Sequence, residues 1–155
     1  MRSDGTPLPD LSETAVLHTL GLITTDQLPD LAARWLAAEL VDTEAVRRLA
    51  GHDRHDPSAL EQLLEDALRE AHAEPPTDAS LIESIAVDYV TTRWRHDRDT
   101  HDAVATLARL GESHADFDLG LFIGLDDEWN GGWGRLAPDL KAAAELEIER
   151  YLHRH

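Results

Sequence analysis

The sequence contains no cysteine, one methionine and a single lysine, and it has no long apolar run. Without cysteine, disulfide bonds and thiolate zinc sites are excluded. The longest apolar runs, around residues 20–23 and 120–125, fall far short of the roughly 18–20 residues that cross a bilayer. The first residues also lack the apolar core of a secretory signal. We therefore expect a cytoplasmic, soluble protein that does not span a membrane.

Positive charge is scarce. The 155 residues include 14 Lys and Arg against 31 Asp and Glu, which gives a net charge of −17 at neutral pH. A charge of this size on a small protein repels phosphate backbones and anionic lipids at long range. Nucleic acid and membranes are therefore disfavoured as partners, whereas a basic protein or a cation suits the charge.

Proline and glycine divide the sequence into segments whose apolar residues recur with helical spacing. No alternating pattern of a strand competes, and Pro75 and Pro76 forbid a helix from crossing the middle of the chain. We predict an all-α fold, a single compact bundle of about six or seven short helices. One helical domain is expected over residues 11–155, after a flexible leader over residues 1–10.

Two helices need closer description. The helix over residues 81–94 has a broad apolar face, so we expect it to lie centrally, with Ile85, Tyr89 and Val90 largely buried. Residues 116–129 are ambiguous, since glycine weakens a helix. There we predict a loop followed by a helix that begins at Gly124.

Two clusters of histidine and aspartate suggest a metal site, over residues 52–56 and 96–102. Their His-Asp dipeptides resemble those of the HD phosphohydrolase superfamily, an all-α family of metal-dependent enzymes. Under that resemblance the metal ligands would come from His52, His55, Asp56, His96, His101 and Asp102. Both clusters, however, follow the ends of predicted helices. There Asp caps free N–H groups and His interacts favourably with the negative helix end. We favour exposed helix ends without a metal or other cofactor.

The most distinctive segment runs from Gly124 through three consecutive acids to a glycine-rich turn that contains Trp133. Trp and Arg dominate the energetics of protein interfaces, so an acidic surface with an exposed ring suits an Arg-bearing partner. We predict a partner-binding patch that consists of Asp126, Asp127, Glu128 and Trp133. Trp129 is expected to be a core anchor instead.

The Gly-Leu-x-x-Glu-Trp element over residues 124–129, with the leucine-rich segment before it and the alanine-rich helix after it, resembles a group of small all-α proteins common in actinobacteria. The resemblance covers roughly residues 28–152. It implies a helical fold and a source, and it carries no activity because that group has no assigned function.

No glycine-rich phosphate loop, nucleophile elbow or dinucleotide motif is present in the sequence. The leading hypothesis is therefore a noncatalytic, acidic helical module that binds a protein, such as an immunity protein, an antitoxin-like inhibitor or an adaptor. The alternative is a metal-dependent hydrolase of the HD type. A sequence-specific regulator is a third hypothesis, against which the negative charge argues.

Overall fold

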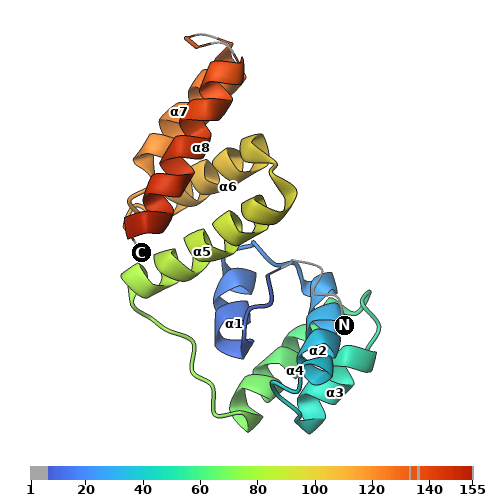
Figure 1. Cartoon of the computed structure of the whole chain (residues 1–155). Coiled ribbons are helices and arrows are strands. Elements are labelled where there is room, and N and C mark those ends of the chain that lie inside the picture. The colour runs from blue at the N-terminus through green and yellow to red at the C-terminus, as the bar shows by residue number, and fades with distance from the viewer. Residues whose placement is uncertain (1–6, 133, 136, 155) are drawn as a thin grey trace. The chain divides into compact units, whose positions relative to one another are not determined.

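The computed structural model describes residues 7–132, 134–135 and 137–154, and it is helical throughout (Figure 1). These residues form eight α-helices and one short 3₁₀ helix, and none of them lies in a strand. The all-α prediction is confirmed, although the helices outnumber the six or seven that we expected. None of the helices in the described part is long and apolar enough to span a membrane.

The chain divides into two compact units at the proline pair. The N-terminal unit, Leu8–Thr77, contains α1 (Leu11–Thr19), η1 (Thr25–Gln27), α2 (Leu28–Ala37), α3 (Glu44–Gly51) and α4 (Pro57–Glu70). The C-terminal unit, from Asp78 onward, contains α5 (Ala79–Asp97), α6 (Thr100–Ser113), α7 (Gly120–Gly131) and α8 (Ala137–Arg154). We expected a single bundle, whereas the helices form two groups. One domain over residues 11–155 stays a prediction, which a single unfolding transition would support.

In the N-terminal unit, the side chain of Trp35 on α2 is almost fully buried. The indole Nε1 of Trp35 donates a hydrogen bond of 2.8 Å to the carbonyl of Pro9, which fixes the chain just before α1 to α2. Asp10 then starts α1 through a capping box, because its carboxylate accepts from the backbone N–H of Glu13. Pro9 and Asp10, which we assigned to a leader, thus contact this unit. Residues 1–6 of that leader lie outside the described residues.

In the C-terminal unit, a chain of two side-chain hydrogen bonds links three helices. Trp94 on α5 donates from Nε1 to the hydroxyl of Thr100 on α6 at 3.0 Å. That hydroxyl donates to the carboxylate of Glu145 on α8 at 3.2 Å. Trp94 and Thr100 are nearly inaccessible to solvent, so the buried indole N–H depends on the Thr100 hydroxyl as its acceptor.

A second polar junction involves Glu83 on α5. Its Oε1 accepts from the hydroxyl of Tyr151 on α8 and from the backbone N–H of Asp118, both at 2.8 Å. Asp118 lies in the connection between α6 and α7. One half-buried carboxylate therefore fixes α8 and this connection to α5.

The two detailed predictions were correct only in part. Helix α5 packs against both α6 and α8, and Val90 is buried, whereas Ile85 and Tyr89 are half-buried. Helix α7 begins at Gly120 and not at Gly124, so the predicted loop was too long. Phe122 and Leu125 are both buried, and burial of this apolar face supports a helix that glycine alone would weaken.

The bond between Trp94 and Thr100 can be tested by replacing Thr100 with valine, which keeps the shape of the side chain. Thr100→Val leaves the indole N–H buried without its acceptor, so we expect a loss of about 1–3 kcal/mol in the free energy of unfolding. Urea denaturation of the full chain measures this loss. The control is Thr92→Val on α5, where the half-exposed hydroxyl has no such bond, with an expected change within about 0.5 kcal/mol. Equal denaturation midpoints for the two variants would contradict the role of Thr100.

Candidate functional site

The predicted acidic patch lies on α7, where two of its three carboxylates already have partners in the chain. Asp126 accepts from the side-chain amide of Asn130 at 3.1 Å. Glu128 accepts two hydrogen bonds from Arg135, at 2.9 and 3.0 Å, and is mostly buried. Asp127 is exposed and makes no ion pair in the described part of the chain. Trp133, the fourth residue of the patch, lies outside the described residues.

Trp129 lies at the contact between α6 and α7, in agreement with a packing role, although it is half-buried and not fully enclosed. Its ring stacks on the imidazole of His101, with ring centroids 4.5 Å apart and planes that differ by 4°. The sequence placed His101 among candidate metal ligands. In the structure His101 is exposed, and the flat face of its ring covers the ring of Trp129.

The first histidine cluster lies in the loop before α4. His52 Nε2 is 3.2 Å from a carboxylate oxygen of Asp56, and the other oxygen of Asp56 caps α4 through the N–H of Ala59. His55 is exposed in the same loop. These residues therefore lie at helix ends, as the capping interpretation predicts.

The second cluster spans the end of α5 and the start of α6. His96 is exposed, Asp99 caps α6 through the N–H of Asp102, and the carboxylate of Asp102 pairs with Arg93 at 3.2 Å. His101 is stacked on Trp129 as described above. Within the residues that the structure describes, no three His, Asp or Glu side chains are grouped as metal ligands would be.

Most cations of the chain are paired with carboxylates of their own unit. In the described residues such ion pairs join Arg47 to Asp42, Arg48 to Glu44, Arg54 to Asp30, Arg69 to Asp66, Arg93 to Asp102, Arg135 to Glu128, Lys141 to Glu145 and Arg150 to Glu147. Because acids outnumber bases two to one, many carboxylates have no such partner.

The unpaired carboxylates occur in both units. Among the described residues, the acids that neither form an ion pair nor accept a hydrogen bond are Glu39, Glu65, Glu74, Asp88, Glu112, Asp116, Asp118, Asp127, Asp139 and Glu149. All are exposed except Glu149, which is half-buried. The surface therefore carries negative charge that the chain itself does not neutralise.

Three of these carboxylates lie close together in the sequence around the connection from α6 to α7. We call Glu112, Asp116 and Asp118 the acidic connection. The backbone here is well anchored: Phe117 and Leu119 are buried, His114 stacks on Phe117 with centroids 4.8 Å apart, and the N–H of Asp118 is bound by Glu83. This segment has no conspicuous sequence signal, because its acids are separated by other residues instead of forming a run.

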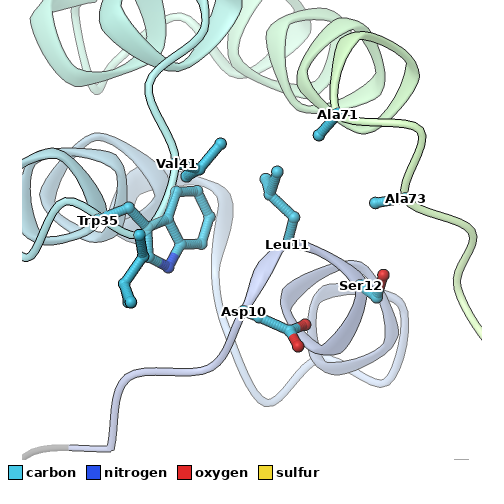
Figure 2. Close-up of a pocket in the computed structure, with 8 residues that line it drawn as sticks. Asp10, Leu11, Ser12, Trp35, Val41, Ala71 and Ala73 are labelled. Atoms are coloured by element: carbon cyan, nitrogen blue, oxygen red, sulfur yellow. The ribbon is translucent and has the colours of Figure 1, made fainter.

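A cavity of about 260 Å³ lies in the N-terminal unit between the start of α1 and the ends of α2 and α4. In Figure 2, Trp35 and Val41 lie on one side, Ala71 and Ala73 lie on the other, and Leu11 lies between them. Leu40, Asp10 and Ser12 complete the lining. We call this cavity the α2–α4 pocket. Its walls are apolar, and its only ionised lining group is the carboxylate of Asp10.

The backbone turns that end α2 and α4 form this pocket. At the end of α2, the N–H of Leu40 bonds to the carbonyl of Trp35, and Glu39 has a left-handed backbone with φ of 57°. At the end of α4, the N–H of Ala73 bonds in the same way to Leu68, and His72 has φ of 52°. Both turns are Schellman motifs, in which glycine usually occupies the left-handed position. The pocket has no clear sequence signal, because neither turn has glycine at its left-handed position.

Two ionisable side chains in the described residues have clearly shifted pKa values, and both lie on the surface of the N-terminal unit. Hydrogen bonds from Gln62 and Arg69 lower the pKa of Asp66 below its ordinary value. The hydrogen bond to Asp42, together with its negative charge, raises the pKa of Arg47. Neither group lines the α2–α4 pocket. These shifts belong to surface ion pairs.

The stacking of His101 on Trp129 predicts a measurable difference between two histidines. His101→Gln removes the ring pair, and we expect it to lower the free energy of unfolding by about 0.5–1.5 kcal/mol. His96→Gln is the control, since both histidines are exposed but no ring contact is found for His96 in the described residues. Urea titration at pH 8, followed by tryptophan fluorescence, compares the two. The same stability for both variants would contradict a packing role for His101.

The metal alternative has its own test in a variant that changes His52, His55, His96 and His101 together to glutamine. Lost helix-end and stacking interactions should reduce stability by about 1–3 kcal/mol, and the fold should remain helical by circular dichroism. The metal content of the untagged wild type is measured in parallel by elemental analysis. One tightly bound metal ion per chain that the variant loses would favour the hydrolase over our interpretation.

No protein-family model, curated protein or solved structure matches the chain. The resemblance to small actinobacterial helical proteins therefore remains a proposal about origin, and the function has to be argued from the residues.

Proposed function

We propose that this chain is a noncatalytic helical protein that binds a basic partner protein through its acidic surface, as an immunity protein, inhibitor or adaptor does. The observation that carries the proposal is the set of exposed carboxylates without a partner in the described residues. These carboxylates are left over although most arginines in the described residues form ion pairs with other acids of the chain. A basic protein supplies the cations that this surface lacks.

Electrostatic attraction explains what such a surface achieves. Unpaired charges at exposed positions contribute little to the stability of a fold, and mutual repulsion between them opposes compaction. Opposite charges on a partner steer it toward the surface and raise the association rate by about 10 to 1,000-fold at low salt. The excess negative charge therefore contributes more to the rate of association with a basic partner than to the stability of this chain.

The acidic connection is the part of the C-terminal unit that we assign to this contact. Its three carboxylates are exposed, whereas Asp126 and Glu128 of the originally predicted patch are engaged with Asn130 and Arg135. The anchored backbone also favours binding, because a fixed segment loses little conformational entropy in a complex. Asp127 remains part of the proposal.

The experiment begins with affinity purification from the native host at low salt, followed by reconstitution of each candidate complex from purified proteins. Surface plasmon resonance then measures the association rate at several salt concentrations. The variant Glu112→Gln/Asp116→Asn/Asp118→Asn removes three charges from the acidic connection. We expect its association rate at low salt to fall by about tenfold, with a weaker dependence on salt.

The matched control, Asp30→Asn/Asp42→Asn/Glu44→Gln, removes the same amount of charge from carboxylates already paired with Arg54, Arg47 and Arg48. It should change the rate less than the first variant does. Equal rates for the two variants would contradict the assignment to the acidic connection. If no basic protein forms a stoichiometric complex, or if association is independent of salt, the proposed function is wrong.

A further inference from the structure

The α2–α4 pocket has a size that limits what it can hold. Its volume of about 260 Å³ lies below the roughly 300–1,000 Å³ of sites that enclose drug-sized ligands or cofactors. It exceeds the roughly 150 Å³ of an engineered apolar cavity that binds benzene. The pocket therefore suits one ring-sized apolar group, such as a single aromatic or branched side chain.

The lining of the pocket is suited to such a group. Trp35 and Leu11 form a floor that is itself buried, whereas Leu40 is 64% exposed and lines the same cavity. Exposure of a large leucine next to a cavity leaves apolar surface that another molecule can cover. Covering that surface favours binding, because removing apolar surface from water is favourable.

Acidic residues outnumber basic ones around the pocket: of the residues that line it or directly adjoin its lining in the chain, six are Asp or Glu, whereas Arg34 beside Trp35 is the one arginine and His72 lies between Ala71 and Ala73. Helices α2 and α4 both end here, so their C-terminal carbonyl groups place partial negative charge at its edge. Asp10 lines the cavity and forms no ion pair, and Glu39 and Glu74, which are likewise unpaired, directly adjoin the lining residues Leu40 and Ala73 in the chain. A cation beside the apolar group is therefore favoured, and an anion is disfavoured.

We propose that the α2–α4 pocket takes one aromatic or branched side chain of the basic partner protein, from a segment in which lysine or arginine flanks that side chain. This inference rests on the proposed function and names the anchor of that interaction. The apolar side chain fills the cavity, and the flanking cations lie against Asp10, Glu39 and Glu74.

Tryptamine and indole-3-propionate test this proposal, because they carry similar indole groups with opposite charges. The full chain is labelled with ¹⁵N, and the indole Nε1–H of Trp35, which donates to Pro9, reports on the pocket. We expect tryptamine to shift this signal in a saturable way at millimolar concentrations. Indole-3-propionate should bind at least about tenfold more weakly, since the surrounding charge repels it.

Three variants locate the binding. Ala73→Leu fills the cavity and should abolish the response to tryptamine, whereas Ala33→Leu, on the exposed face of α2, should leave it unchanged. Asp10→Asn preserves the cap of α1, because asparagine is an equally good N-cap, but it removes a charge. We expect it to reduce the preference for tryptamine by about two- to fivefold. A folded spectrum for each variant shows that the structure is retained.

The pocket proposal is overturned if tryptamine does not shift the Trp35 signal, if both indole compounds bind equally, or if Ala73→Leu binds tryptamine as well as the wild type does. Its failure differs from failure of the proposed function. A basic partner whose dissociation rate is unchanged by Ala73→Leu would refute the pocket and retain the function. Tryptamine binding without any basic partner would refute the function, and the anchor role with it.

Discussion

The structure has to accommodate about twice as many carboxylates as cations in a chain of 155 residues. Repulsion between the carboxylates opposes folding, so the cost of this excess depends on where in the fold each carboxylate lies. Several lie where the backbone itself attracts negative charge: Asp10, Asp56, Asp78 and Asp99 cap the starts of α1, α4, α5 and α6. There they accept N–H groups that would otherwise lack partners and they interact favourably with the helix dipole. The remaining excess stays on the surface, facing water.

Local chemistry explains which parts of the fold were predictable. Asp56 and Pro57 start α4, and the apolar stripe that follows repeats with helical spacing, so a sequence alone predicts this helix. The same holds for the cap at Asp99 and for the break at the proline pair. These features depend only on residues a few positions apart. The all-α class follows from them.

Features that depend on distant residues could not be predicted in this way. The incomplete burial of Ile85 and Tyr89 depends on which faces of α5 are covered by α6 and α8, and helical spacing does not contain that information. The stack of His101 on Trp129 joins two helices, whereas the local pattern indicated an exposed helix end, with a metal ligand as the alternative. The α2–α4 pocket depends on left-handed turns at Glu39 and His72, whereas the sequence signal for such turns is glycine.

Charge and shape would have separate roles in the proposed complex. Unpaired carboxylates attract any basic protein, so charge alone accelerates encounter without selecting among basic partners. To select one partner among basic proteins, the chain also needs a short-range contact that fits only one arrangement of apolar groups. The α2–α4 pocket provides such a contact because a cavity of fixed size rejects groups that are too large and gains little from groups that are too small. Salt should therefore act mainly on association, whereas the fit of one apolar side chain should set the lifetime of the complex.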